Sequence, residues 1–231
     1  MIEKIIQKLK GNPNYRFENS YTTLDLLIIL SDRALELIRG ILFIKCFLKN
    51  SKGLIFIGKA VRVRHGNKIT VGKNFIVGNF STINGLSLNG IEIGDNVSIG
   101  SNSTVLCTGV ISHVGVGIKI GSGTGINSNA FLAGQGGIVI GENVIIGPGV
   151  KIFSENHNFS EIEILIKDQG VSRKGVTIKN NCWIGANVTI IDGVVIEEGC
   201  VIAAGSVVTK SFTKMSIIGG IPAKIIRSRL T

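Results

Sequence analysis

The sequence predicts a mainly β protein: a parallel β-helix of about seven coils, with an N-terminal helical segment and a short C-terminal cap. First, an aliphatic residue recurs at every sixth position through most of the chain. Second, the chain contains 31 glycines but only 3 prolines among its 231 residues. Third, hydrophobic residues make up 44% of the chain although aromatic residues make up only 6%. Glycine and small β-branched residues suit a repetitive sheet with tight corners better than a globule built around aromatic rings.

The six-residue repeat is longest near the C-terminus. Its aliphatic positions there are Ile178, Ile184, Ile190, Ile196, Ile202 and Val208. Five shorter runs have the same step: Ile57, Val63, Ile69; Val71, Val77, Ile83; Ile93, Ile99, Val105; Ile120, Ile126, Leu132; and Ile140, Ile146, Ile152. Neither a helix nor a simple strand has this period. Each hexapeptide is therefore read as a short strand plus a corner, and three of them form one triangular coil that rises by roughly 4.8 Å.

A stack of coils buries its interior only against neighbouring coils, so both ends need a cap. We divide the chain into a helical segment at 1–52, a β-helix at 53–212 and a cap at 213–231. The repeat breaks on a large scale once, between Ile152 and Ile178, which predicts a loop at 154–176. Long loops inside compact folds are commonly functional.

The stretch from Thr22 to Lys49 is rich in Leu and Ile and contains no proline, which favours a helix. Thr22 or Thr23 is suited to cap its start. Two interpretations remain open for this helix. It packs on the β-helix or on a neighbouring subunit, or it lies at a membrane interface with its basic residues near lipid headgroups.

Charge and cysteine content narrow the class of protein. The net charge of +10 favours anionic partners, but no nucleic-acid motif or dense basic run is present, so no nucleic-acid partner is expected. The four cysteines have no metal-ligand spacing, which is typical of a reducing cytoplasm. Residues 1–14 lack an apolar signal core, and no uncharged stretch is long enough to span a membrane. A cytoplasmic location is expected, at the inner face of the membrane if the helix is interfacial.

Three motifs, in order, resemble those of the hexapeptide-repeat acyltransferases. They are Asn181-Cys182-Trp183-Ile184-Gly185, Ala204-Gly205-Ser206-Val207-Val208-Thr209-Lys210, and Gly219-Gly220-Ile221-Pro222-Ala223-Lys224 with Arg227. The nearest relatives in this resemblance are sugar O-acetyltransferases of the galactoside, maltose and nodulation type, and those acting on capsule, exopolysaccharide or O-antigen sugars. The resemblance implies a left-handed β-helix, a homotrimer with active sites between subunits, acetyl-CoA as co-substrate and a saccharide acceptor.

His157, at the start of the long loop, matches the catalytic histidine of this family. A neutral imidazole would take the proton of a sugar hydroxyl during attack on the thioester. The resemblance assigns the backbone amide of Ala186 to the oxyanion and Asn127 to a sugar hydroxyl, although a structural corner role for Asn127 remains equally open. The residue that orients His157 also stays open among Gln169, placed near the substrate, Glu155 and Asp168.

The same motifs supply residues for the acidic cofactor. The resemblance places Trp183 beside the acyl-CoA tunnel and Ala204 at the pantetheine arm. Four further residues match positions that contact coenzyme A: Thr209, Lys210, Lys224 and Arg227. A structural role for Trp183, as a packing residue, stays open as well.

No metal site is expected. His65 and His157 lie about five coils apart, or roughly 20–25 Å, whereas zinc needs nitrogen ligands within about 2.1 Å. Cys182 and Cys200 occupy the small, inward fifth position of their hexapeptides, so we interpret them as core residues. Two other functions stay open: N-acetylation of a nucleotide-linked amino sugar, and a non-enzymatic β-helix scaffold.

Overall fold

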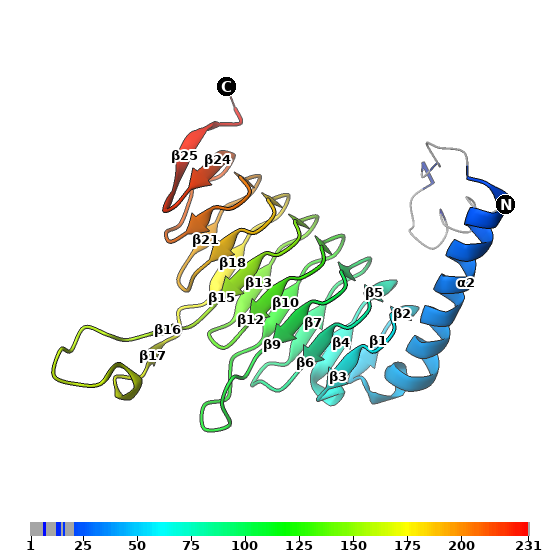
Figure 1. Cartoon of the computed structure of the whole chain (residues 1–231), viewed down its shortest axis with the longest axis horizontal. Coiled ribbons are helices and arrows are strands. Elements are labelled where there is room, and N and C mark those ends of the chain that lie inside the picture. The colour runs from blue at the N-terminus through cyan, green and yellow to red at the C-terminus, as the bar shows by residue number, and fades with distance from the viewer. Residues whose placement is uncertain (1–6, 8–12, 15, 17–20, 231) are drawn as a thin grey trace.

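The structure, a computed structural model, describes residues 7, 13, 14, 16 and 21–230. The prediction that residues 1–14 lack a signal segment falls largely outside these residues. The chain forms a solenoid of triangular coils, with helix α2 across its N-terminal end and a β-hairpin at its C-terminal end (Figure 1).

Helix α2 (Thr23–Arg39) begins where the sequence predicts. The Thr22 side chain accepts a hydrogen bond from the Asp25 amide at 3.2 Å, and Asp25 accepts one in return from the Thr22 amide at 3.0 Å. This reciprocal capping box satisfies two free donors of the first turn. The helix then changes type, to a π-helical turn at Gly40–Ile44 and a 3₁₀ turn at Lys45–Phe47.

Three sheets form the faces of the prism. Sheet A contains β1 (Asn50–Ser51), β4 (Ile69–Val71), β7 (Ile91–Ile93), β10 (Ile118–Ile120), β13 (Ile138–Ile140), β18 (Val176–Ile178) and β21 (Val195–Ile196). Sheet B contains β2 (Ile55–Ile57), β5 (Phe75–Val77), β8 (Ser98–Ile99), β11 (Gly125–Ile126), β14 (Ile145–Ile146), β19 (Trp183–Ile184), β22 (Val201–Ile202), β24 (Ser216–Gly220) and β25 (Ala223–Ser228). Sheet C contains β3 (Arg62–Arg64), β6 (Thr82–Asn84), β9 (Thr104–Leu106), β12 (Phe131–Ala133), β15 (Lys151–Phe153), β20 (Thr189–Ile190) and β23 (Val207–Val208).

The seven strands in each of sheets A and C confirm the predicted number of coils. Strands on each face pair in parallel, so equivalent aliphatic residues stack, as Ile140 does on Ile178 and Ile178 on Ile196. The repeat positions predicted to point inward are buried, except Val63 in the first coil, which is partly buried. The core is therefore one column of Ile and Val along the axis.

The corners explain two features of the repeat. The residue after the aliphatic position is often glycine because the next coil is too close for a side chain: a Cβ on Gly141 would lie 2.7 Å from the Asn180 amide nitrogen. Three residues after the aliphatic position the backbone is left-handed, and Asn, which tolerates this conformation, often stands there. These residues are Asn74, Asn96, Asn102, Asn129, Asn143, Asn181 and Asn187, with φ between 55° and 62°.

The longest excursions leave the solenoid at one corner, between sheets C and A. They are the 3₁₀ turn at Gly66–Lys68, the loops at 85–90 and 107–117, and the long predicted loop at 154–175, which we call the arm. Figure 1 shows the arm and the loop at 107–117 projecting on the same side of the stack.

The C-terminal end is closed by the hairpin of β24 and β25. Strand β24 pairs in parallel with β22 and so continues sheet B, and β25 then pairs antiparallel with β24. The hairpin covers an edge that would otherwise leave the amides and carbonyls of β22 unpaired. No helix among the described residues is long and apolar enough to cross a membrane.

Gly40 is where α2 meets the first coil. A Cβ at this position would collide with the backbone carbonyl of Ile55, which cannot move without shifting β2. We expect Gly40→Ala to lower the free energy of unfolding by about 1–3 kcal/mol despite the better helix propensity of alanine. Thermal unfolding measures this, with Ser31→Ala on the exposed side of α2 as the control. An unchanged melting temperature would show that the contact between Gly40 and β2 does not contribute to stability.

Candidate active site

The arm starts from a rigid corner at the end of β15. Ser154 is buried there, and its hydroxyl donates to the Ala133 carbonyl at 2.7 Å and accepts from the Gly136 amide at 2.9 Å. The ring centroids of Phe153 and Phe131, on adjacent coils, lie 5.8 Å apart. The residues that follow Ser154 therefore leave the solenoid in a fixed direction.

His157 lies on a short ladder at the base of the arm. Strand β16 (Asn156–His157) pairs antiparallel with β17 (Val171–Ser172), which places His157 opposite Val171. The His157 side chain is exposed. No described residue exchanges a hydrogen bond with its ring. The ladder thus fixes the backbone of this histidine and leaves both ring nitrogens open to a substrate or another chain.

Arg173 holds the base of the arm. Its Nε donates to Glu155 Oε2 at 2.6 Å, and its other nitrogens donate to the carbonyls of Val114 at 3.2 Å and His113 at 3.4 Å. It therefore joins both strands of the arm to the neighbouring loop at 107–117. No motif in the sequence indicates this role, because Arg173 and the loop at 107–117 become neighbours only once the coils are stacked.

We expect Arg173→Gln to loosen His157 without unfolding the chain. Both side chains of the ion pair are only about one-fifth exposed, so losing this charged hydrogen bond should cost about 1.5–3 kcal/mol, a loss confined to the base of the arm. In the acyl transfer that the resemblance implies, with His157 as the base, kcat should fall roughly tenfold because a displaced base loses its orientation toward the reacting atoms, while KM for acyl-CoA stays the same. Arg173→Lys should restore part of kcat. Lys167→Gln, which alters an exposed ion pair at the tip of the arm, is the control. Equal loss in kcat and in melting temperature would make Arg173 merely structural.

The three candidates for orienting His157 are engaged elsewhere. Gln169 braces the tip of the arm: its Nε2 donates to the carbonyls of Glu161 and Ile164, both at 2.7 Å. Glu155 pairs with Arg173, and Asp168 lies 4.0 Å from Lys167. Among the described residues, none of these three side chains therefore hydrogen-bonds to the His157 ring.

The Ala186 amide lies at the corner between sheets B and C, after β19. Its N–H has no hydrogen-bond partner among the described residues. At several other corners the equivalent amide donates to a side-chain oxygen one coil further along: Lys59 to Asn79, Lys73 to Asp95, Asp95 to Ser122 and Glu142 to Asn180. One coil after Ala186 that position is Ala204, which has no oxygen to offer. The Ala186 N–H is therefore free, as are the equivalent corner amides of Asn79, Ser101, Ser122 and Asn180 among the described residues.

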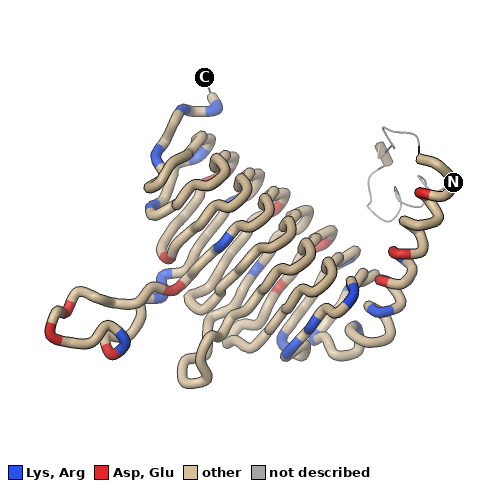
Figure 2. Tube along the Cα trace, viewed as in Figure 1, with Lys and Arg blue, Asp and Glu red and all other residues tan. Residues whose placement is uncertain are grey.

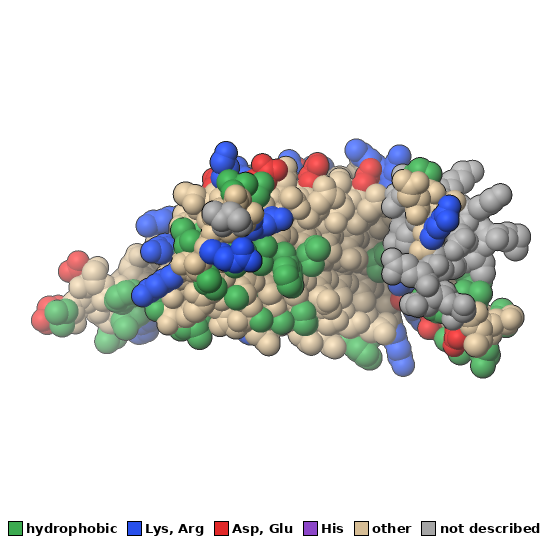
Figure 3. Space-filling model, turned by 90° about the horizontal axis from the view of Figure 1, so that it is seen from above, with side chains coloured by type: hydrophobic (Ala, Val, Ile, Leu, Met, Phe, Trp, Pro, Cys, Tyr) green, Lys and Arg blue, Asp and Glu red, His purple; other side chains and the backbone are tan. Residues whose placement is uncertain are grey.

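The remaining predicted cofactor residues fall into two groups. Trp183 is 55% exposed on the outer face of sheet B, and Lys224 and Arg227 are exposed on β25 at the end of the same sheet. Thr209 and Lys210 follow β23 at the corner between sheets C and A. Figure 3 shows Lys and Arg side chains gathered over this C-terminal end of the solenoid.

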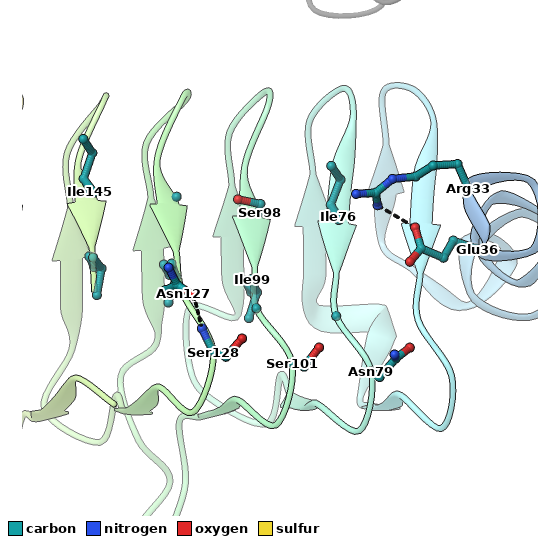
Figure 4. Close-up of a pocket in the computed structure, with 15 residues that line it drawn as sticks. Arg33, Glu36, Ile76, Asn79, Ser98, Ile99, Ser101, Asn127, Ser128 and Ile145 are labelled. Carbon is teal, nitrogen blue, oxygen red and sulfur yellow. Dashed lines mark hydrogen bonds and ion pairs between the residues drawn. The ribbon is translucent and has the colours of Figure 1, made fainter. Parts of the chain in front are cut away.

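Asn127 lines a groove of about 460 Å³ between α2 and sheet B (Figure 4). The groove is hollow because Ser98 and Gly125 stand between Ile76 and Ile145 in the outward column of sheet B. Asn127 itself accepts a hydrogen bond from the Ser128 amide at 2.8 Å. This contact is the structural role at a coil corner that the sequence leaves open for Asn127. The column continues from Ile145 to Trp183.

Arg33 and Glu36 form the wall of this groove on the α2 side, where they pair at 2.6 Å. Asn79 lines it from the second coil. The sequence did not indicate these three residues, because it does not show which sheet the helix faces.

Cys182 and Cys200 are buried and stacked on adjacent coils, which confirms that they belong to the core. The Cys182 Sγ donates to the Glu197 carbonyl at 3.2 Å, and the neighbouring Cys200 thiol together with burial raises the pKa of Cys182, so this sulfur stays protonated. Among the described residues, no group of three or more His, Cys, Asp or Glu side chains is arranged to hold a metal ion.

Comparison with known proteins agrees with the repeat. The family model described as "Bacterial transferase hexapeptide (six repeats)" matches residues 175–210. Galactoside O-acetyltransferase of Escherichia coli is 38% identical over 91 residues, which is 39% of this chain and 43% of that protein. A putative lipopolysaccharide biosynthesis O-acetyl transferase of E. coli, WbbJ, is 25% identical over 84% of this chain and 87% of its own length.

The chain spans about half the length of several curated relatives, such as 51% of a probable acetyltransferase from Mycobacterium tuberculosis. Among solved structures, a mutant of the N-acyltransferase AntD from Bacillus cereus, in complex with dTDP and coenzyme A, has a TM-score of 0.53. It is 20% identical and the match covers 91% of this chain and 92% of that one. These comparisons confirm the predicted fold, a left-handed parallel β-helix.

Proposed function

We propose, on the premise that this chain is a left-handed β-helix protein of the hexapeptide-repeat transferases, that it moves an acetyl group from acetyl-CoA to a hydroxyl of a saccharide. The acceptor in this proposal is a precursor of a surface polysaccharide. The observation that carries the proposal is the pairing of an exposed histidine on a braced arm with an unpaired backbone amide at Ala186. The names of the E. coli relatives point to the same chemistry.

In the proposed reaction His157 takes the proton of the acceptor hydroxyl while its oxygen attacks the thioester carbonyl. The Ala186 amide donates to the oxygen of the tetrahedral intermediate, where negative charge develops. The thioester C–S bond then breaks, and coenzyme A leaves after protonation of its sulfur by the His157 imidazolium. Trp183, Lys224 and Arg227 would bind the cofactor along sheet B.

The acceptor would enter along the groove, whose lining ends at Ile145, the neighbour of Trp183 in the outward column of sheet B. Asn127, Asn79 and the Arg33–Glu36 pair offer it hydrogen-bond donors and acceptors beside the flat, apolar surface of Ile76 and Ile145. Such a mixture of amide, charged and apolar groups suits a sugar ring with several hydroxyls.

Proton NMR of the surface polysaccharide tests the function. Cells with the wild-type protein should show base-labile O-acetyl signals, and cells with His157→Ala should lack them while the variant protein stays folded. Unchanged O-acetyl signals would reject the proposal. N-acetylation of a nucleotide-linked amino sugar is the second candidate, because the match to AntD covers nearly the whole of both chains. It predicts a base-stable amide product with such a sugar and acetyl-CoA.

We further propose that the site lies between subunits of a homotrimer. His157 leaves the solenoid at the corner between sheets C and A, whereas Ala186 lies at the corner between sheets B and C. One face of the prism separates them within a chain. A neighbouring copy would bring the arm of one subunit to the amide of another.

Mixed trimers check this arrangement. Subunits with His157→Gln and subunits with Ala204→Asn, a change that offers an oxygen to the Ala186 amide, should each be inactive. Co-expressed in equal amounts, they should regain about one quarter of wild-type activity, since one interface in four then pairs two intact halves. Light scattering verifies the trimer. A trimeric mixture that stays inactive would place the whole site within one chain.

A further inference from the structure

Helix α2 presents an apolar face to solvent. The side that faces sheet B carries Arg33 and Glu36, and Gly40 follows them against β2. The opposite side carries Leu and Ile at helical spacing: Leu24, Leu27, Ile28, Leu35, Ile38 and Leu42. Each of these is about half exposed or more, up to 65% at Leu24. Phe43 and Phe47, at 63% and 69% exposure, extend the face beyond the helix.

The same end of the molecule, residues 21–91, carries a net charge of +7 out of the +10 of the whole chain, from ten basic and three acidic residues. From Leu37 to Ile91 the chain contains no Asp or Glu, and its basic residues are Arg39, Lys45, Lys49, Lys52, Lys59, Arg62, Arg64, Lys68 and Lys73. None of them forms an ion pair with any described residue. Figure 2 shows this basic cluster at the foot of α2 and on the first coils.

We propose that the apolar face of α2, together with these basic residues, docks on the surface of an anionic lipid bilayer. An apolar helix face about 28 Å long beside unpaired Lys and Arg matches acyl chains lying beneath anionic headgroups. Phe43 and Phe47 lie at the junction of the apolar and basic parts. The helix runs across the end of the solenoid, so the whole face meets a plane, and the arm lies near the other end (Figure 1).

A second copy of the chain fits this surface less well. Two such ends in contact would bring two clusters of nine unpaired basic residues together, with only Asp25, Asp32 and Glu36 of each α2 as carboxylates, and like charges in excess at an interface oppose association. The choice of lipid rests on this charge pattern, and it does not depend on the acyl-transfer reaction.

Vesicle flotation with the full chain tests the proposal. The protein should float with vesicles of phosphatidylglycerol and phosphatidylcholine, and much less with phosphatidylcholine alone or at high salt. Lys49→Glu with Lys52→Glu should weaken binding at least about 30-fold, given the contribution of each basic residue near an anionic surface. Leu27→Ser with Leu35→Ser should also abolish flotation.

Matched controls keep the result specific. Lys179→Glu with Lys214→Glu changes the same charge at the other end, and Leu88→Ser with Leu230→Ser removes exposed leucines elsewhere. Both pairs should bind like wild type, and all variants should keep the wild-type melting temperature. No flotation of the wild type, or equal loss in the controls, would overturn the proposal. So would self-association of the wild type that Leu27→Ser with Leu35→Ser removes, because α2 would then be covered by a second copy.

Discussion

Replacing His157 by glutamine is expected to lower kcat for acyl transfer about 10²- to 10⁴-fold, because the acceptor hydroxyl then has no base to take its proton. Glutamine keeps a polar side chain at this place on β16, so the ladder with β17 should persist. The melting temperature should not change, since the His157 side chain is exposed and no described residue bonds to its ring. Release of coenzyme A with a saccharide acceptor measures kcat, and KM for acetyl-CoA should stay within about twofold.

The other two histidines supply the control. His65 accepts or donates one hydrogen bond with Asn84 at 2.8 Å in the first coils, and His113 lies exposed in the loop at 107–117. His65→Gln and His113→Gln should leave kcat close to wild type. If His157→Gln also retained full activity, the base would be another group and the proposed mechanism would be wrong.

The repeat made the fold predictable because each hexapeptide has the same task. The residue that points inward must be aliphatic at every sixth position, and Ile140, Ile178 and Ile196 meet that need in three successive coils of sheet A. One break in this pattern located the arm. The left-handed backbone conformation at the corners was harder to predict. The role of Asn143 or Asn181 there becomes clear only from its positive φ angle.

The details of the site were less predictable because they depend on which coils are neighbours. Arg173 lies 59 residues from Val114, yet their contact holds the arm. The resemblance places Gln169 near the substrate, which stays a prediction, and within the chain its side-chain amide braces the arm tip. The groove needs α2 to face sheet B, and no residue pattern within the helix indicates that face.

Replacing Ala204 by asparagine is expected to lower kcat about 10²- to 10³-fold, the usual effect of losing one oxyanion donor. The asparagine oxygen would accept the Ala186 N–H, as Asn180 accepts the Glu142 amide at 2.9 Å at an equivalent corner. The amide would then be satisfied by the protein and not by the reaction intermediate. The same new hydrogen bond should stabilise the fold by about 0.5–1.5 kcal/mol. A more stable and less active variant is the expected signature, measured by thermal unfolding and steady-state kinetics.

Replacing Ala204 by leucine separates the effect of the new hydrogen bond from the effect of side-chain size. Ala204→Leu has the branching of asparagine and a somewhat larger volume but no oxygen, so it should leave the Ala186 amide free and keep more of kcat, although it crowds the pantetheine path at least as much. Calorimetric titration with coenzyme A checks that the two bind the cofactor alike. If leucine lost as much kcat as asparagine, steric exclusion would explain the effect and the Ala186 amide would have no part in catalysis. If only asparagine lost it, the absence of a side-chain oxygen at Ala204 would be what keeps a donor open at this corner, whereas the corner amides of Lys59, Lys73, Asp95 and Glu142 are closed.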